Sequence, residues 1–296
     1  QMFIRYHKVP QDKISVIPNG VAEMFSYSDK KTKSMIYTSI PYKGLEVLAK
    51  VIPLVHKKHP DTKFKIFSSM SLYGDDQLDT YIDTYDLLKS LPNVEYSRAT
   101  DREKLVEHYQ EAAFFVHPNK WEETFCVSMT EAMRCGAFPI ITDIGALAEV
   151  AGENNAQVVP IQGNPTNKGY EVTHDFINNF AETCCLILDH YDKSYHKQVS
   201  KRISDYVIEK YNWKTISNQW KTLIHSITGE SITMTESNEN IVETTAKKET
   251  SMLPYDPINA EQAVTDEDYL QIASENVFRW EQSDREMAQG RTNFQL

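Results

Sequence analysis

Two glutamates separated by seven residues, Glu123 and Glu131, stand where an apolar run passes through a loop into a helix. The run 113–116 is stopped by Pro118, and apolar residues then recur at helical spacing until Gly136, which should end the helix as a C-terminal cap. A helix that follows a strand and a loop presents unpaired backbone N–H groups and the positive end of its dipole. Such a helix start binds anions, and a phosphate is the expected ligand.

Carboxylates beside a phosphate are repelled by it unless they accept hydrogen bonds from hydroxyl groups of the same ligand. Side chains on a helix lean toward its N-terminus, so Glu131 can reach back toward a ligand held over the first turn. A diphosphate flanked by a ribose and a hexose would supply both the anions and the hydroxyls. The alternative is an ordinary helix with an acidic first turn and one solvated glutamate.

Strand and helix patterns alternate around this stretch, which predicts an α/β fold with a Rossmann-like parallel sheet covered by helices. Such folds bind ligands at the carboxyl ends of their strands. We expect Asp101 to cap the helix that follows it. The expected strands are 35–38, 64–67, 94–96, 113–116, 138–142 and 157–159; the expected helices are 45–59, 78–88, 102–112, 125–135, 146–150, 176–187 and 213–227, and 162–171 is expected to be a loop.

The character of the sequence changes after Gly229. Residues 230–296 contain 14 acidic and 5 basic residues, and so carry most of the chain's net charge of −11. Residues 230–257 have too little apolar content to offset their ordering entropy, and are predicted to be a disordered acidic linker. Residues 258–296 are predicted to begin a further, unidentified module. We expect 1–22 to be the end of an interdomain helix and the segment leading into a domain at 23–229, within a longer multidomain polypeptide.

Composition argues against several classes of protein. Residues 1–229 are near neutral and carry no basic stripe, so a nucleic-acid partner is not expected. No apolar run approaches the length of a transmembrane segment. The four cysteines form no C-x-x-C pair and are expected to be reduced core thiols of a cytoplasmic protein. No group of His, Asp, Glu and Cys has metal-ligand spacing, and dinucleotide and P-loop motifs are absent, so neither a metal nor another cofactor is expected.

Three ordered motifs resemble a known family. The spacing of Glu123 and Glu131, followed by Ala132-Met133-x-x-Gly136-x-x-Pro139, resembles the E-x7-E signature of retaining glycosyltransferases with the GT-B fold, of the group 1 or family 4 type. Upstream, Val16-Ile17-Pro18-Asn19-Gly20-Val21 resembles the segment leading into their second domain. The stretch 37–48, in which a Ser-x-Pro turn precedes Lys43-Gly44, resembles a subset of the family. The resemblance covers roughly residues 1–227 and implies the C-terminal, nucleotide-sugar-binding domain.

The resemblance implies transfer of a sugar from a nucleoside diphosphate sugar to a hydroxyl of a glycan or another acceptor, with retention of configuration and without a metal. Lys43 would stabilise the departing diphosphate, and Glu131 would hold the ribose hydroxyls. Glu123 would hold the donor sugar. The implied donor-binding residues are Ser39, Lys43, Arg98, Glu123, Thr124, Phe125, Cys126 and Glu131, of which Glu123 and Lys43 are the candidate catalytic residues.

The resemblance implies that the acceptor site lies across a cleft, on a first domain that we expect to belong to the same, longer polypeptide. The chain alone is therefore expected to bind donor without transferring sugar. The usual arginine a few residues before Lys43 is missing, since Thr38, Ser39 and Ile40 stand at those positions. This departure and the linker leave one alternative open, a catalytically silent sugar-nucleotide-binding or scaffolding module of a multidomain protein. A GT-B sugar-nucleotide epimerase is a second alternative, and the E-x7-E motif argues against it.

Overall fold

The computed structural model describes residues 7–70, 80–98, 100–167 and 169–229. Nearly all of them belong to the first of two compact units, Gln1–Ser226. The expected linker at 230–257 and the expected further module at 258–296 lie outside the described residues, as do the first six residues and residues 71–79.

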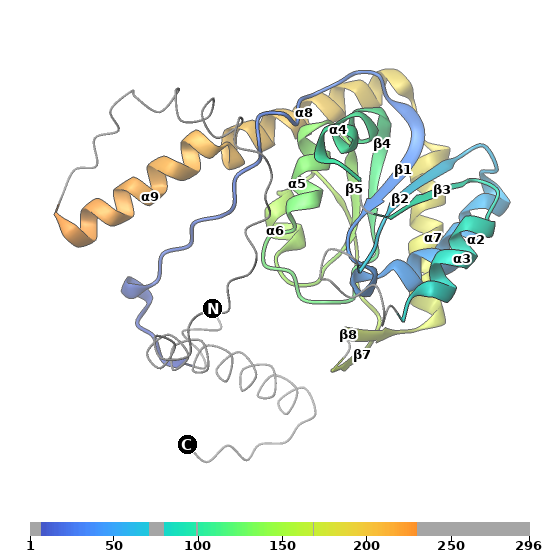
Figure 1. The fold of residues 1–296 in the computed structure, drawn as a ribbon, viewed down its shortest axis with the longest axis horizontal. Helices are drawn as coiled ribbons and strands as arrows, with labels where there is room; N and C mark the ends of the chain where they lie inside the picture. The colour runs from blue at the N-terminus through green and yellow to red at the C-terminus, as the bar shows by residue number, and fades with distance from the viewer. Residues whose placement is uncertain (1–6, 71–79, 99, 168, 230–296) are drawn as a thin grey trace, which may run out of the picture. The chain divides into compact units, whose positions relative to one another are not determined.

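Six parallel strands form one sheet in the order β3-β2-β1-β4-β5-β6 (Figure 1). The predicted parallel sheet is thereby confirmed. After β1 the chain adds β2 and β3 on one side, and then returns to add β4, β5 and β6 on the other. This reversal makes the carboxyl ends of β1 and β4 the switch point at which open α/β sheets bind ligands. The strands are β1 (Thr32–Thr38), β2 (Lys63–Phe67), β3 (Val94–Ser97), β4 (Ala112–His117), β5 (Phe138–Thr142) and β6 (Gln157–Val159).

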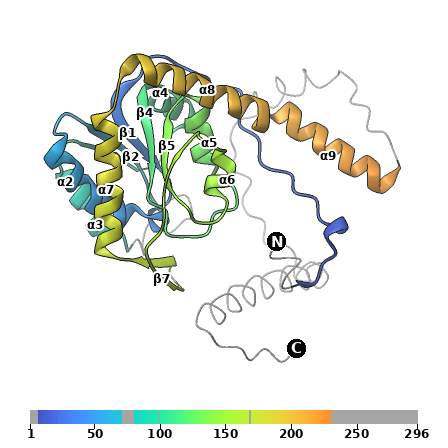
Figure 2. The same ribbon diagram turned by 180° about the vertical axis from the view of Figure 1, so that it is seen from behind.

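Helices cover both faces of the sheet (Figures 1 and 2). One face carries α2 (Leu45–Lys58), α3 (Ile82–Ser90) and α7 (His174–Asp189), and the other carries α4 (Arg102–Glu111), α5 (Val127–Arg134), α6 (Leu147–Ala151) and α8 (Lys193–Tyr211). Among the described residues, a short 3-10 turn, η1 (Gln11–Lys13), precedes the sheet, and a further helix, α9 (Trp213–Thr228), follows it. No helix among the described residues combines the length and the apolar character needed to cross a membrane.

Each face has its own apolar core, because successive side chains of a strand point to opposite sides of the sheet. Phe114 of β4 packs in the core beneath α2 and α7, together with Leu48. Its neighbour Phe115 packs on the other side with Met129 and Met133 of α5. The apolar face predicted for α5 is thus the face that seats this helix on the sheet.

The C-terminal cap predicted at Gly136 is confirmed. Gly136 has a left-handed φ of 92°. The backbone N–H of Ala137 donates to the carbonyl of Ala132 at 2.9 Å, which is the longer bond of a Schellman motif. The prediction for Asp101 is wrong in one respect. Asp101 stands before α4, but its carboxylate forms an ion pair with Lys104, 3.2 Å away, and makes no capping hydrogen bond.

Two elements differ from the sequence prediction. The expected loop 162–171 contains an antiparallel hairpin, β7 (Gly163–Thr166) and β8 (Gly169–Val172), whose short strands bury no residue and leave no alternating apolar pattern to detect. Helix α8 was not predicted, because its buried side includes the polar residues His196, Ser200 and Ser204. The Ser204 hydroxyl donates to the carbonyl of Arg134 at 2.6 Å, so α8 packs on α5 partly through polar contacts.

The two loops at the switch point pack closely against each other at a glycine. The turn η2 (Pro41–Lys43) follows β1 and ends at Gly44, which has a φ of 117°. A Cβ atom at Gly44 would lie 2.1 Å from the carbonyl oxygen of Pro118, in the loop that follows β4. Only glycine allows this contact without moving the backbone, and the contact fixes the position of Lys43 relative to the β4 loop.

Gly44→Ala should lower the free energy of unfolding by at least about 3 kcal/mol, because it combines left-handed strain with a backbone clash. Gly229→Ala is the matched control, since Gly229 has a φ of 73° and no described residue lies within 4 Å of the place that a Cβ atom would take there. The control should cost only the left-handed strain, about 1–2 kcal/mol. Urea unfolding measures both, and equal costs for the two variants would contradict the close packing of the two loops.

Candidate functional site

Lys43 and Glu123 meet across the switch point. Lys43 lies after β1 and Glu123 lies in the loop after β4, and the Lys43 Nζ is 3.0 Å from the Glu123 Oε1. Only 15% of the lysine side chain and 16% of the glutamate side chain are exposed, so this is not a solvated surface pair. The same ammonium group donates to the carbonyl of Glu122 at 3.3 Å. The structure therefore brings together the two residues predicted to be catalytic.

The backbone of Glu123 is held by the loop after β5. The N–H of Ala146 donates to the Glu123 carbonyl at 2.7 Å. Gly145 has a φ of 62°, and a Cβ there would lie 2.3 Å from the same carbonyl oxygen. Three strand ends, those of β1, β4 and β5, thus determine where this carboxylate points.

Helix α5 begins at the same place. Cys126 is its N-cap residue, with a left-handed backbone (φ 62°, ψ 78°) that non-glycine residues seldom adopt, and no side chain caps the helix. The first turn therefore directs backbone N–H groups and the positive end of the dipole toward the loop that carries Glu123. This is the anion-binding geometry predicted from the sequence.

Glu131 is buried in α5, with 5% of its surface exposed. Its carboxylate forms an ion pair with the guanidinium of Arg102, the first residue of α4. Arg102 in turn lies over the ring of Phe25, 5.3 Å from its centroid. Burial raises the pKa of the Glu131 carboxyl above its ordinary value, while the charge of Arg102 and its hydrogen bond act to lower it. Arg102 was not predicted from the sequence.

The loop between β4 and α5 is braced from two sides. Asn119 is fully buried, and its side chain accepts a hydrogen bond from the N–H of Trp121 at 3.0 Å. The ring of Trp121 meets the ring of Tyr42 edge-on, with centroids 5.5 Å apart. On the other side, the N–H of Tyr170 in β8 donates to the carbonyl of Lys120 at 2.8 Å. The unpredicted hairpin therefore supports the site loop directly.

His117, the last residue of β4, is fully buried between the rings of Tyr37 and Phe115, each with a centroid 5.6 Å away. Neither ring nitrogen has a hydrogen-bond partner among the residues that the structure describes. Burial, with a smaller contribution from the charge of Lys43, lowers the pKa of His117 to about 3. The imidazole is therefore neutral at physiological pH.

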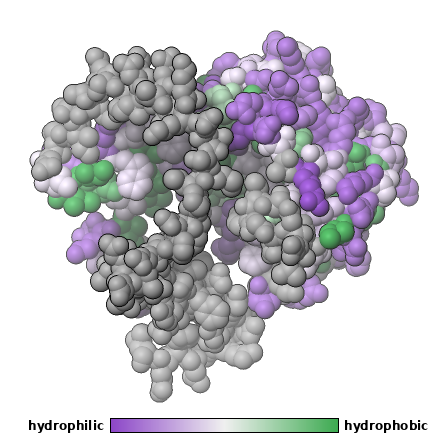
Figure 3. All heavy atoms as spheres, viewed as in Figure 1, coloured by the Kyte–Doolittle hydropathy of each residue, from purple (hydrophilic) through white to green (hydrophobic). Residues whose placement is uncertain are grey.

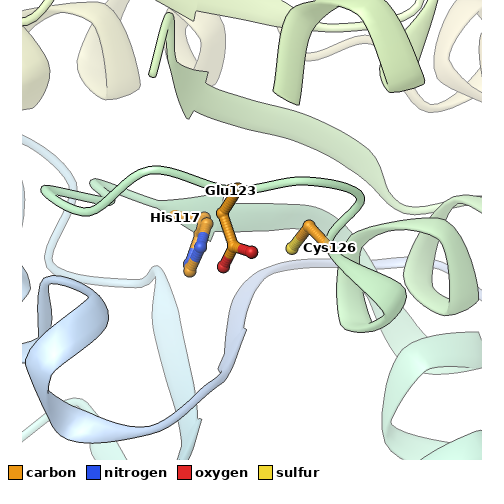
Figure 4. Close-up of side chains that lie close together, drawn as sticks. All are labelled: His117, Glu123 and Cys126. Atoms are coloured by element: carbon orange, nitrogen blue, oxygen red, sulfur yellow. The ribbon is translucent and has the colours of Figure 1, made fainter. Parts of the chain in front are cut away.

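His117, Glu123 and Cys126 form a cluster that sequence spacing does not reveal (Figure 4). One ligand-capable atom of each lies within 4.8 Å of the other two. They come from the end of β4, the loop and the start of α5, and the carboxylate of Glu123 stands between the imidazole and the thiol. Burial and the charge of Glu123 raise the pKa of the Cys126 thiol to about 12.

The remaining predicted site residues are placed less centrally. Ser39 follows β1, and its carbonyl accepts a hydrogen bond from Ser68 at 2.6 Å. Thr124 is exposed in the loop, whereas Phe125 is buried against Tyr211, with ring centroids 5.2 Å apart. Arg98 is exposed just after β3, two strands from β1, or about 10 Å across the sheet.

Comparison with known proteins gives a family match over about half of the chain. Residues 23–167 match the family model of glycosyl transferases group 1. The resemblance of the motifs to group 1 glycosyltransferases is thus confirmed over these residues, while retention, family 4 and the C-terminal position of the domain stay predictions.

Individual relatives agree with this match. The chain is 24% identical over 229 residues to the phosphatidylinositol N-acetylglucosaminyltransferase gpi3 subunit of Schizosaccharomyces pombe, covering 74% of this chain and 44% of that protein. The pneumococcal O-GlcNAc transferase GtfA, solved with UDP and GlcNAc, has a TM-score of 0.57 at 18% identity, covering 77% of this chain and 42% of the other. Sucrose-phosphate synthase from Thermosynechococcus elongatus has a TM-score of 0.58 at 20% identity, covering 77% of this chain and 56% of the other. The chain therefore spans about half the length of these proteins, and the likeness to the solved structures shows the fold.

The ion pair of Arg102 and Glu131 leads to a pH-dependent prediction. Because the folded protein disfavours the ionised form of Glu131, folding stability is lost as the pH rises from about 4.5, the ordinary pKa, through the raised pKa of this carboxyl. The stability of Glu131→Gln relative to the native protein should therefore increase over this window, by about 1.4 kcal/mol for each unit of raised pKa.

The stability of Glu131→Gln can also be compared with that of the unsubstituted Glu131 in a chain that carries Arg102→Gln. The increase with pH should then be larger, because the charge that lowers the pKa of Glu131 is gone. Urea unfolding between roughly pH 4 and pH 8 measures the difference. A stability difference that does not change with pH, or that shrinks when Arg102 is replaced, would show that burial and Arg102 do not control this carboxyl.

Proposed function

We propose that this chain is the donor-binding part of a retaining GT-B glycosyltransferase, and that it binds a nucleoside diphosphate sugar at the switch point of the sheet. The observation that carries the proposal is a pair of carboxylate–cation contacts around α5. Glu123 is paired with Lys43, and Glu131 is paired with Arg102. Both carboxylates are largely buried, one just before α5 and the other within it.

These paired charges match a ligand that has anionic and hydroxyl groups in alternation. A diphosphate can replace the two carboxylates as the partner of Lys43 and Arg102, because both cationic side chains donate hydrogen bonds and neither can accept one. The hydroxyls of a ribose and a hexose can then donate to the carboxylates that the cations release. A simple phosphate would satisfy the cations alone and would leave two buried carboxylates without partners, which costs free energy. A nucleoside diphosphate sugar satisfies all four groups.

The same geometry supports departure of the diphosphate. Negative charge develops on the leaving oxygen as the bond to the sugar breaks, and preorganised donors at that position lower the barrier. The ammonium of Lys43 and the N–H groups of the first turn of α5 are such donors, with the helix dipole acting in the same direction. We infer that Lys43 compensates for the arginine missing at residues 38–40, and that Glu123 orients the hexose.

The acceptor site is proposed to lie on another domain that packs against this one. Trp213 and Trp220 of α9 are each 50% exposed, and Val16, in the segment before the sheet, is 83% exposed. Green, hydrophobic atoms are visible on the α9 side of the space-filling view (Figure 3). Exposed aromatic and aliphatic groups of this kind are typical of surfaces that a partner domain covers. The first donor to test is UDP-GlcNAc, because two of the similar proteins are named for N-acetylglucosamine transfer.

Two substitutions separate the proposed roles of the glutamates. Glu131→Ala removes an acceptor for the ribose, which the nucleoside diphosphate and the sugar nucleotide share. It should raise both dissociation constants by about 10- to 100-fold, since a hydrogen bond to a charged group contributes about 1.5–3 kcal/mol. Glu123→Ala should weaken only the sugar nucleotide, and should leave the diphosphate unchanged or tighter because Lys43 loses its competing partner.

Calorimetric titration of the two ligands tests this pattern, with a circular dichroism spectrum to confirm that each variant is folded. Glu122→Ala is the matched control: it removes an exposed neighbouring carboxylate and should leave both affinities within about twofold. If Glu123→Ala and Glu131→Ala behave like this control, the two carboxylates do not bind a donor.

Donor binding is also proposed to need no divalent metal, because Lys43 and the helix dipole already supply positive charge beside the diphosphate. The dissociation constant of UDP should be the same, within about twofold, in a chelator and in excess magnesium. Binding seen by calorimetry only when magnesium or manganese is present would contradict this mechanism.

A further inference from the structure

The cluster of His117, Glu123 and Cys126 points to a second ligand. We propose that these three residues form a binding site for one thiophilic divalent cation of the zinc class. The three residues lie at the proposed donor site, so the effect of the ion on the donor rests on the proposed function, whereas the cation site itself does not.

The donor set and its spacing carry the proposal. Imidazole nitrogen, carboxylate oxygen and thiolate sulfur are the three ligand types that zinc takes in proteins. Zinc–ligand distances of about 2.0–2.3 Å place tetrahedral ligands about 3–4 Å from each other. The three candidate atoms already lie within 4.8 Å of one another, so small side-chain rotations bring them to a common ion.

The buried histidine is the independent observation. His117 is fully buried, and in the described part of the chain neither of its ring nitrogens has a hydrogen-bond partner. An unpaired polar group at this depth costs free energy, and native structures seldom leave one without a ligand, water or protein partner. The imidazole lies beside the carboxylate of Glu123 (Figure 4). An ion there would satisfy one nitrogen of His117, which no residue among those the structure describes does.

Cys126 contributes through its backbone conformation as well as its sulfur. Its left-handed φ of 62° is strained for a residue with a Cβ atom. A thiol held at a position that favours glycine is consistent with a role for the sulfur itself. Binding forms a zinc–sulfur bond and releases the thiol proton to solvent, which leaves one position on a tetrahedral ion open.

Lys43 opposes the ion, because its ammonium group is 3.0 Å from the same carboxylate. A bound cation must displace it from Glu123. The carboxylate is then engaged and can no longer accept a hydrogen bond from the hexose of a donor. Zinc should accordingly act as an inhibitor that excludes the sugar nucleotide, and not as a cofactor.

Cobalt and zinc titrations of the full chain test the site. Co²⁺ should produce a sulfur-to-cobalt charge-transfer band with a stoichiometry of one ion per chain. Zn²⁺ should displace the cobalt and abolish the band. The affinity for zinc is measured separately, by competition with a chromophoric chelator. Cys126→Gly should remove the band and weaken zinc by at least about 100-fold, which exceeds the 10- to 100-fold cost of losing an outer-sphere partner. Glycine suits the left-handed backbone, so this variant should remain folded.

Two further variants sharpen the test. Cys135→Ala is the matched control, because Cys135 is a buried free cysteine at the other end of α5, outside the cluster, and should leave zinc affinity unchanged. Lys43→Met should tighten zinc by about tenfold or more, since a like charge beside the ion is removed. Zinc should also raise the dissociation constant of UDP-GlcNAc for the native chain but not for Cys126→Gly. Zinc that binds free nucleotide in solution affects both chains alike, so the difference between them reports only the zinc bound to the protein.

The cation site is overturned if the cobalt band is absent, or if zinc affinity is the same in Cys126→Gly as in the native chain. Zinc that binds as proposed without affecting the sugar nucleotide overturns the inhibition alone. A chain that shows the cobalt band but binds no nucleotide under any condition contradicts the proposed function and leaves the cation site standing.

Discussion

The order of the parallel strands reverses between β1 and β4, and the geometry of the site depends on that reversal. It leaves the loops after these two strands side by side, with no helix crossing between them. Gly44 and Pro118 approach each other more closely than any residue with a Cβ atom would permit. From this contact follow the pairing of Lys43 with Glu123 and the direction in which the first turn of α5 points.

The electrostatics of the site favour function over stability. Glu131 is buried with a raised pKa, and Arg102 only partly offsets the cost of its burial. His117 is buried without a hydrogen-bond partner among the described residues, and Cys126 holds a strained backbone conformation. Each of these features lowers the stability of the folded chain, and all of them lie within one short stretch of β4, its loop and α5. Energetically unfavourable features that lie this close together are typical of sites where a ligand supplies the missing interactions.

Much of the fold could be predicted from the sequence, because the strands and most helices carry clear apolar periods. Gly136 and the spacing of Glu123 and Glu131 also located the central helix and the residues around its start. Helix α8 was missed because Ser200 and Ser204 interrupt its apolar face. The β7–β8 hairpin was missed because its pairing is made by backbone groups on short strands that bury no residue. The partners of the site residues were beyond sequence analysis for a different reason. Arg102 reaches Glu131 from another helix, and the cluster of His117, Glu123 and Cys126 converges only when strand, loop and helix are folded, so spacing along the chain gives no sign of either arrangement.

We propose that the carboxyl ends of β1 and β4, with the start of α5, hold a nucleoside diphosphate. A crystal structure of the chain with bound UDP tests this directly. Diphosphate oxygens are expected on Lys43 and on the first-turn N–H groups of α5, with the ribose hydroxyls on Glu131 in place of Arg102. Nucleotide density elsewhere on the domain, with the Lys43–Glu123 and Arg102–Glu131 pairs unchanged, would contradict it.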